Sequence, residues 1–190
     1  MNPEIDRIND IRKTIQIDRE LSRLRADIVA LQETRLADSG SIRESNFTFF
    51  WHGKRSDDRR EHGVGFAVRN TLLQCITSPV ATSERLITLR VNSRYGVTNI
   101  ISVYAPTLYA NADTKDQFYD SLSQVLSNIP NSQSVYLVGD FNARIGADHQ
   151  SWPTCLGKFG VGKINDNGQR LLELCTQYNL CATSSFSMAN

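Results

Sequence analysis

Cysteine is scarce in this sequence and follows no metal-binding or disulfide spacing. The four cysteines are Cys75, Cys155, Cys175 and Cys181, and no two of them form a C-x-x-C pair. This spacing argues against a zinc ribbon and against a disulfide framework. We therefore expect reduced thiols, with Cys175 and Cys181 as small core residues, in an intracellular protein that is nuclear or cytoplasmic and not secreted.

Long apolar runs and a strong excess of charge are also absent. No run approaches the length of a membrane span, and the first four residues have neither the basic nor the apolar part of a secretory signal. We therefore expect no membrane partner. The formal net charge is only +1, so any affinity for phosphate groups must come from a local patch. The 190 residues suffice for one domain with a real core.

Apolar periodicity predicts a mixture of helices and strands. Helices are predicted over residues 3–25, 114–129 and 169–178, and strands over residues 28–31, 47–51, 63–68, 86–91, 97–104, 135–138 and 180–183. Asp113 or Thr114 is expected to cap the second helix. The Gly-closed segment 92–96 indicates a hairpin, so at least part of the sheet is antiparallel. The pattern predicts an α/β fold, a layered α/β sandwich with mixed or antiparallel sheets.

The end of the strand at 135–138 is the most informative position in the chain. The strand runs directly into Gly139-Asp140-Phe141-Asn142. Side chains on an extended backbone alternate, so Asp140 and Asn142 are expected to point the same way. A carboxylate there can take the proton of an attacking water, while an amide donates to an anionic phosphate oxygen. The alternative interpretation is an ordinary turn with Asx hydrogen bonds.

Two further strands end in residues that are capable of chemistry. Glu33 follows the strand at 28–31, and Tyr104 ends the strand at 97–104. Equivalent strand ends gather on one rim of a layered sheet. Taken singly, the Glu is typical of a solvated surface and the Tyr of a packed sheet edge. Their appearance together with Asp140 and Asn142 favours a common site.

Four segments resemble a known family. They are Ile-Val-Ala-Leu-Gln-Glu-Thr at 28–34, Glu-His-Gly-Val-Gly at 61–65, Ser-Val-Tyr-Ala-Pro at 102–106 and Gly-Asp-Phe-Asn-Ala-Arg at 139–144. They resemble the endonuclease/exonuclease/phosphatase superfamily, and more closely the apurinic-type endonuclease domain of non-LTR retrotransposons and the related craniofacial development protein 2-like host sequences. The likeness runs from Ile17 to Thr183. It implies a four-layer α/β sandwich and a Mg²⁺-dependent phosphodiesterase that acts on DNA, with Mn²⁺ as a possible substitute.

The resemblance also implies roles for individual residues. Glu33 would be the main metal carboxylate, which suffices because Mg²⁺ keeps several waters and needs only one or two protein carboxylates. Asp140 would orient or deprotonate the attacking water, and Asn142 would hold a phosphate oxygen. Tyr104 would donate its hydroxyl near the scissile phosphate.

Three further residues are candidates for substrate contact. His62 lies close in sequence to a basic loop and could border a DNA groove, although the loop's own acidic residues could equally leave it a solvated segment. Arg144 ends the Gly-Asp-Phe-Asn-Ala-Arg motif. Asn167 either contacts the DNA backbone or, with Asn165 and Asp166, caps the third helix.

The sequence departs from the family pattern at two places. The residues before 28 read as helix, where the family has a strand ending in Trp-Asn, and the closing Asp-His is not found. We therefore expect a single partial, incomplete domain, with a substituted helix at 1–16, the family-like region at 17–183 and a polar tail at 184–190. Groups that act as a unit lose most of the rate when one is removed, so weak or no hydrolysis is expected. Open strand edges could also lead to self-association.

Two alternatives remain open at this point. The chain could be a catalytically dead, retrotransposon-derived fragment that at most binds nucleic acid. It could also be a phosphatase or phospholipid esterase of the same superfamily. This interpretation is less favoured, because the sequences of the motifs resemble the retrotransposon type.

Overall fold

The computed structural model describes residues 3–186, and its chain forms two compact units. The sheet unit consists of Met1–Val103 and Asn131–Gly139, and the helical unit consists of Tyr104–Pro130 and Asp140–Asn190, each as far as it is described. The predicted single partial domain over residues 1–190, with its family-like region at 17–183, stays a prediction. Residues 1–2 of the expected N-terminal helix and residues 187–190 of the expected polar tail lie outside the described residues.

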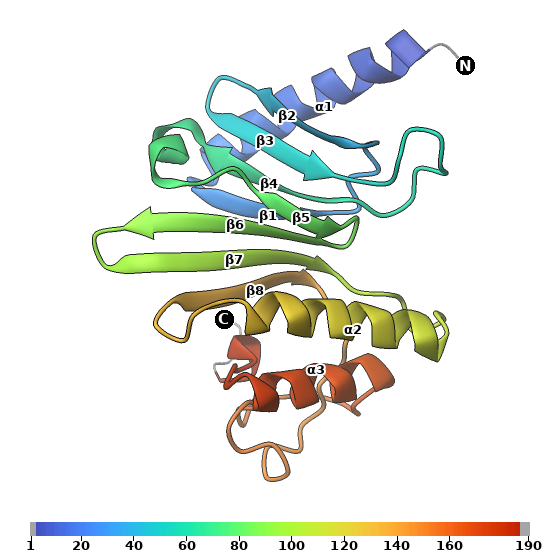
Figure 1. Ribbon diagram of the computed structural model, residues 1–190, viewed down its shortest axis with the longest axis vertical. Helices are drawn as coiled ribbons and strands as arrows, with labels where there is room; N and C mark the ends of the chain where they lie inside the picture. Colours follow the sequence, from blue (N-terminus) through green and yellow to red (C-terminus); the bar gives the residue numbers. More distant parts are fainter. Residues whose placement is uncertain (1–2, 187–190) are drawn as a thin grey trace. The chain divides into compact units, whose positions relative to one another are not determined.

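The sheet unit contains two four-stranded sheets, which Figure 1 shows one above the other. The first has the order β1-β4-β3-β2, and all its neighbouring strands are antiparallel; the strands are β1 Ile28–Gln32, β2 Ser39–Arg43, β3 Phe47–His52 and β4 Val64–Arg69. The second has the order β5-β6-β7-β8, with β5 Val80–Ser83, β6 Leu86–Ser93, β7 Gly96–Tyr104 and β8 Ser134–Asp140. The short 3-10 helix η1 Asn70–Cys75 lies between β4 and β5. The predicted α/β sandwich with antiparallel pairs is confirmed.

Helix α1 Pro3–Arg23 is held against the first sheet by one buried carboxylate. Asp18 Oδ1 accepts hydrogen bonds from the backbone N–H groups of Asn46 at 3.0 Å and Phe47 at 2.8 Å. Its Oδ2 accepts from Asn46 Nδ2 at 2.8 Å. Apolar packing of Leu21 against the Phe47–Phe49 core completes the attachment. The helix is continuous through Arg23, which confirms the helix predicted at 3–25.

The predicted hairpin is confirmed as β6 and β7, and β8 lies next to β7 and runs in the same direction (Figure 1). In the sheet unit, a Cβ on Gly139 would lie only 2.1 Å from the Val103 carbonyl oxygen. In the helical unit, the N–H of Ala105 donates to the Asp140 carbonyl at 2.8 Å. The carboxyl ends of the two strands therefore lie side by side, as a crossover through a helix requires.

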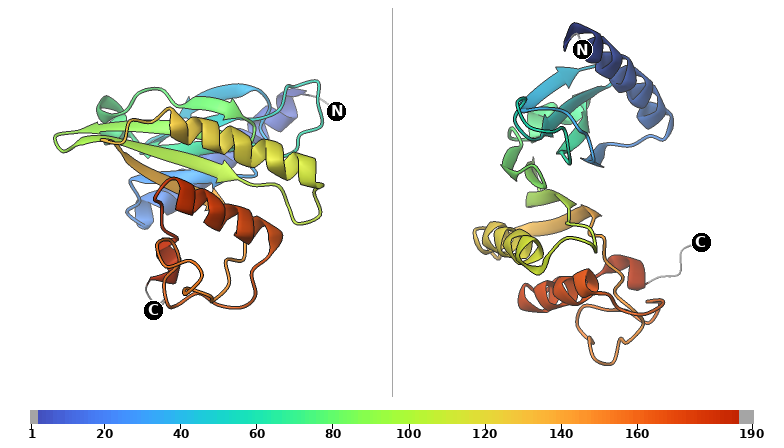
Figure 2. Two further views of the ribbon diagram at one scale, coloured as in Figure 1. Left: turned by 60° about the horizontal axis from the view of Figure 1, so that its bottom comes forward. Right: turned by 90° about the vertical axis from the view of Figure 1, so that its right-hand side faces the viewer.

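The helical unit is built around α2 Ala112–Ser127 and α3 Asp166–Gln177, which pack against each other (Figure 2). The buried residues of α3 include the four predicted ones, Leu171, Leu172, Leu174 and Cys175. The hydroxyl groups of Ser123 and Tyr178 lie 2.6 Å apart between the two helices. None of the helices within residues 3–186 is long and apolar enough to cross a membrane.

Three predictions about the helical unit are wrong. Residues 180–183 form no strand, because the N–H of Leu180 donates to Cys175 and that of Ala182 donates to Cys155; the 3-10 helix η2 Thr183–Ser185 follows. Cys181 is exposed and not a core residue. The cap of α2 is Asn111, whose side chain accepts from the N–H of Thr114 at 2.8 Å, because the helix begins two residues earlier than expected.

Candidate active site

The ends of β7 and β8 bring three of the predicted site residues together in the helical unit. Tyr104, the last residue of β7, is 7 % exposed, and Asp140, the last residue of β8, is exposed. The backbone bond from Ala105 to Asp140 fixes the two strand ends to each other. Asn142 follows two residues later and joins the same cluster through its side chain, whose Nδ2 donates to the Ala105 carbonyl at 3.0 Å.

The turn at Asp140–Asn142 differs from the extended geometry that alternation predicts. β8 ends at Asp140, and Asn142 has a φ of 48°, in the left-handed region. Asp140 Oδ1 accepts the N–H of Asn142 at 2.8 Å, which is the Asx turn of the alternative interpretation. The turn does not remove the carboxylate from solvent. An amide has two N–H groups, so the bond to Ala105 leaves one for a phosphate oxygen.

Asn167 has a structural role and no exposed surface. It is 0 % exposed, and its Nδ2 lies 2.8 Å from the carbonyl oxygen of Pro106, 3.3 Å from that of Phe141 and 3.2 Å from that of Asn142. Its own carbonyl accepts the Tyr119 hydroxyl at 3.0 Å. The predicted contact of Asn167 with DNA stays a prediction, and the burial of the side chain gives it no support. The residue holds the two segments that follow β7 and β8 to the start of α3.

The N-terminus of α3 is capped by Asn165, as the alternative interpretation of this segment proposed. Asn165 Oδ1 accepts from Gly168 N at 2.7 Å and from Arg144 N at 3.0 Å. A Cβ at Gly168 would lie 1.9 Å from the Arg144 carbonyl oxygen, so only glycine allows this close approach. The Arg144 side chain is exposed beside the turn at Asp140–Asn142, which is consistent with its predicted contact with substrate.

The sheet unit gathers the ends of β1, β7 and β8. Gln32 Nε2, at the end of β1, donates to Ser102 Oγ at 3.1 Å, and a Cβ on Gly139 would lie 3.0 Å from the same nitrogen. Ser102 Oγ in turn donates to the Leu31 carbonyl at 3.3 Å. Glu33 and Asp140 are the residues that directly follow Gln32 and Gly139 in the chain.

Glu33 and His62 lie on adjacent segments of the sheet unit. Thr34 N donates to the Gly63 carbonyl at 3.2 Å, and Arg35 N donates to the His62 carbonyl at 2.9 Å. Glu33 and His62 both have positive φ values, 52° and 66°, so neither continues the extended backbone of the nearby strands β1 and β4. The Glu33 carboxylate is half-exposed and lies 3.3 Å from the Arg35 guanidinium.

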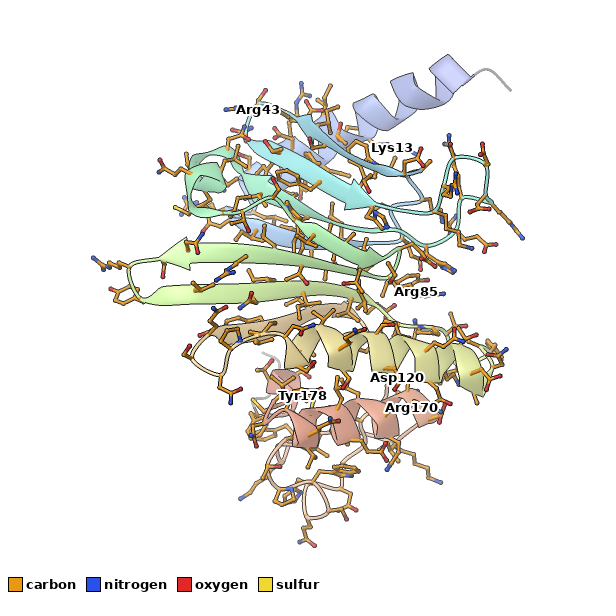
Figure 3. The ribbon with its side chains drawn as sticks, viewed as in Figure 1. Lys13, Arg43, Arg85, Asp120, Arg170 and Tyr178 are labelled. Atoms are coloured by element: carbon orange, nitrogen blue, oxygen red, sulfur yellow. The ribbon has the colours of Figure 1, made fainter. Side chains whose placement is uncertain are left out.

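The His62 imidazole contacts a cation. Its Nε2 lies 2.9 Å from the Nη2 of Arg85, which precedes β6 and is labelled in Figure 3. Burial lowers the pKa of His62 below its ordinary value, and the Arg85 charge lowers this pKa further. The neutral ring can therefore accept a hydrogen bond from Arg85. His62 and Arg85 thus form a basic pair, and the predicted position of His62 at the border of a DNA groove stays a prediction.

This arrangement predicts a dependence of stability on pH. The folded-state pKa of His62 lies below the unfolded value of about 6.5, so the unfolded state takes up the proton first. The free energy of unfolding should therefore fall as the pH drops below about 6.5 and level off below the folded-state pKa. His62→Gln should remove this decline in urea unfolding measured at successive pH values. If the slope of unfolding free energy against pH is unchanged in His62→Gln, the decline does not come from His62. Arg85→Gln should reduce the slope, because it removes the positive charge that lowers the pKa of His62.

The donor chemistry of Glu33 fits a magnesium or manganese ion. These ions prefer oxygen ligands and keep several waters, so one half-exposed carboxylate is an adequate anchor. Within residues 13–186, whose side chains are described, no group of three or more His, Cys, Asp and Glu residues could hold a metal. Within the described residues, a metal ion would therefore be held by few protein ligands and by water.

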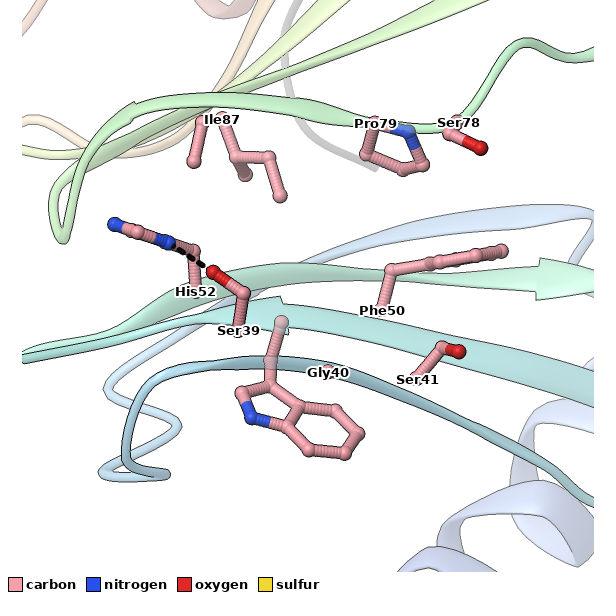
Figure 4. A pocket seen from close by; sticks show the side chains of 10 residues that line it. Ser39, Gly40, Ser41, Phe50, His52, Ser78, Pro79 and Ile87 are labelled. Atoms are coloured by element: carbon pink, nitrogen blue, oxygen red, sulfur yellow. Dashed lines mark hydrogen bonds between the residues drawn. The ribbon is translucent and has the colours of Figure 1, made fainter. Parts of the chain in front are cut away.

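A pocket of about 320 Å³ lies elsewhere in the sheet unit and contains none of the predicted site residues (Figure 4). His52 Nδ1 and Ser39 Oγ lie 2.6 Å apart at one side, and Pro79 and Ile87 face them. The residues that line it are Ser39, Gly40, Ser41, Phe50, Trp51, His52, Ser78, Pro79, Ala81 and Ile87. The Ser39–His52 pair is a cross-strand contact between β2 and β3.

Sequence reasoning missed Ser102 and Arg85. Ser102 is 0 % exposed within an apolar strand, and a buried hydroxyl requires a partner, so its position in the Ile-Ile-Ser-Val run was an available signal. Arg85 had no such signal, because only the pairing of segments far apart in the chain brings it to His62.

Comparisons with known proteins place this arrangement in one family. Residues 9–166 match the model of the Endonuclease/Exonuclease/phosphatase family. Craniofacial development protein 2 of Bos taurus is 28 % identical over 169 residues, covering 89 % of this chain and 28 % of that protein. The protein of the same name from Tragulus javanicus is 28 % identical over 159 residues, covering 84 % and 27 %. The chain thus spans little more than a quarter of these curated relatives.

Solved structures share the fold. The AP endonuclease LMAP of Leishmania major matches with a TM-score of 0.58 at 13 % identity, covering 88 % of this chain and 62 % of that one. The endonuclease domain of TRAS1, a telomere-specific non-LTR retrotransposon, matches with a TM-score of 0.57 at 12 % identity, covering 87 % and 65 %.

Proposed function

Because the chain belongs to the endonuclease/exonuclease/phosphatase family, we propose that it is a metal-dependent phosphodiesterase that cuts DNA, of the retrotransposon endonuclease type. The observation that carries the proposal is the cluster of Tyr104, Asp140 and Asn142 at the adjoining ends of β7 and β8. The structural likeness to a retrotransposon endonuclease domain and to an AP endonuclease supports the choice of DNA as substrate.

The three residues have complementary roles in this proposal. Asp140 is exposed at the end of its strand, so its carboxylate can take the proton of an attacking water. The remaining N–H of Asn142 donates to a phosphate oxygen as negative charge develops there. The Tyr104 hydroxyl donates near the leaving group. Asn167 and Asn165 act only through the backbone segments that they hold in place.

The metal would be held by Glu33. Members of this family generally depend on a divalent metal. A Mg²⁺ or Mn²⁺ ion at this carboxylate would neutralise phosphate charge and lower the pKa of a bound water. The basic pair of His62 and Arg85 and the exposed Arg144 would contact DNA phosphates, which position the duplex without reading its sequence.

We propose that residues 1–190 by themselves hydrolyse DNA slowly. The Asn of the family's Trp-Asn strand and its closing Asp-His are not among these residues, and helix α1 stands before β1. Catalytic groups that act as a unit are strongly non-additive, so a partial set retains little of the rate. DNA binding without turnover is the second candidate function, and the presence of α1 before β1 is what favours it.

Nicking of supercoiled plasmid tests the proposal. Residues 1–190 should nick plasmid in Mg²⁺ or Mn²⁺ and not in EDTA, and Asp140→Ala should remove the activity. Nicking that persists unchanged in Asp140→Ala would exclude the assignment, because it would come from another source. No nicking, together with retained DNA binding, would favour the second candidate. Hydrolysis of a phosphomonoester alone would favour a phosphatase.

A further inference from the structure

Large apolar side chains gather on one exposed segment of the helical unit. Phe159 is 42 % exposed, Val161 81 % and Ile164 41 %, and all three lie within the stretch Lys158–Ile164. Exposed apolar residues on soluble proteins are normally scattered singly. Three within six positions of one irregular loop indicate a surface that contacts a partner.

Backbone contacts hold this segment in place. Gly157 N donates to Ser185 Oγ at 2.8 Å, and Phe159 N donates to the Ser185 carbonyl at 2.9 Å. A Cβ at Gly160 would lie 2.2 Å from the Gly146 carbonyl oxygen, so the chain there packs tightly on the preceding arm of the loop. The apolar side chains are therefore presented by an ordered backbone, which reduces the entropy lost on binding.

The segment borders the turn at Asp140–Asn142 within the same unit. Asn165 N donates to the Arg144 carbonyl at 3.0 Å, and Asn165 Nδ2 donates to the Asn142 carbonyl at 3.3 Å. The returning arm of the loop thus runs beside the residues that follow the turn. A substrate whose reacting phosphodiester lies at Asp140 would extend over this arm.

The charge of the segment suits a polyanion. Lys158 and Lys163 are exposed, and residues 156–165 contain no acidic residue. Asp148, the one acidic residue between positions 143 and 165, accepts the backbone N–H of Ser151 at 3.2 Å and its hydroxyl at 2.7 Å, and these bonds lower its pKa, so it keeps its negative charge. The stretch Lys158–Ile164 itself carries two lysines and no acid, so it presents positive charge with interleaved apolar side chains.

We infer that Lys158–Ile164 is a contact surface for duplex DNA beside the phosphodiester that is cut. The two lysines contact phosphates, and Phe159, Val161 and Ile164 pack against sugars and base edges in the minor groove. The inference rests on the proposed function, because it takes the substrate from it. An acidic protein would satisfy the lysines but gives no reason for apolar side chains so close to the turn.

DNA binding measured by fluorescence anisotropy in an Asp140→Ala background tests the charged part. Each phosphate contact contributes about 0.9 to the slope of log affinity against log salt, so Lys158→Ala/Lys163→Ala should lower this slope by about two. The matched control is Arg90→Ala/Arg94→Ala, which removes two exposed positive charges from the β6–β7 hairpin of the sheet unit. Equal effects of the two pairs would overturn the inference.

Val161→Ser/Ile164→Ser tests the apolar part. Duplex affinity should fall on the order of tenfold with an unchanged salt slope, because apolar burial is lost and no charge is removed. An unchanged affinity would overturn the inference, as would an equal loss of binding to polyglutamate, which would indicate an acidic protein partner. Unchanged melting temperatures confirm that these exposed substitutions leave the fold intact.

This test and the test of the proposed function fail separately. Anisotropy measures binding without cleavage, so a chain that never nicks plasmid can still lose duplex affinity in the lysine variant. That result would contradict the catalytic proposal and retain the surface. Nicking that depends on Asp140, together with DNA binding that does not change in the Lys158/Lys163 and Val161/Ile164 variants, would retain the catalytic proposal and contradict the contact surface.

Discussion

Glu33→Gln should lower the rate of metal-dependent plasmid nicking on the order of a thousandfold. Gln keeps the size and shape of the side chain, but it replaces one acceptor oxygen with an NH2 donor and removes the charge that anchors a hard divalent cation. The substitution leaves the backbone at Glu33 unchanged, including its positive φ, so the loss should appear in catalysis and metal binding and not in folding.

Metal-dependent melting gives an independent readout of the same substitution. A ligand that binds only the folded state raises its stability in proportion to the logarithm of ligand concentration above the Kd. Mg²⁺ or Mn²⁺ should therefore raise the melting temperature of the native chain and not that of Glu33→Gln. Glu20→Gln is the control, since it removes an exposed carboxylate from α1 of the same unit. A metal response that survives in Glu33→Gln would show that the ion binds elsewhere.

Gly139→Ala should reduce the free energy of unfolding by about 3 kcal/mol or more. Gly139 has a φ of 138°, which side-chain-bearing residues rarely adopt, and its Cβ would lie 2.1 Å from the Val103 carbonyl oxygen. That oxygen belongs to the neighbouring strand β7, so the clash cannot be relieved by rotating a side chain. Urea denaturation of the two proteins measures the difference.

Gly96→Ala separates the two causes. Gly96 also has a positive φ, 120°, but nothing lies within 4 Å of a Cβ there. Its replacement should cost about 1–2 kcal/mol, which is the penalty for a left-handed backbone alone. If Gly139→Ala costs no more than Gly96→Ala, the close contact with β7 is not limiting, and the ends of β7 and β8 have more room than the structure gives them.

Much of the fold could be predicted because most elements have a local signal. The β6–β7 hairpin closes at a glycine, and α3 has a clear apolar face. β2 has almost none: its sequence is Ser-Gly-Ser-Ile-Arg, and it becomes a strand through pairing with β3. A Cβ at Gly40 would lie 2.3 Å from the Trp51 ring, so the Trp51 side chain on β3 covers that position. Such pairing is not visible in a short window of sequence.

Strand burial shows the same limit. The apolar runs of β1 and β8 suggest fully buried strands, but both lie at the edges of their sheets in the part of the chain that is described, and their residues are half-buried or exposed. Tyr136 in β8 is 57 % exposed. An apolar run indicates a strand without indicating its place in the sheet.

The candidate site was predicted more fully in its residues than in their geometry. Asp140 and Asn142 were identified from a short motif, but the reason for their proximity is the Asx turn and not strand alternation. Asn167 shows the opposite case. A polar residue at the start of a helix is usually exposed, and only the packing of three carbonyl groups around its amide shows that it is buried.

The division of the chain into two discontinuous units affects how the protein folds during synthesis and whether its fragments can be expressed separately. Each unit takes two stretches of sequence, so any uninterrupted fragment that contains one unit whole also contains a stretch of the other. A ribosome completes β7 long before β8, with α2 synthesised between them, and the edge of β7 stays unpaired during that interval. Expression of residues 1–103 or of residues 104–190 as a separate polypeptide should therefore yield insoluble or chaperone-bound product. Chains rearranged so that the two stretches of each unit follow one another in sequence would not share this weakness.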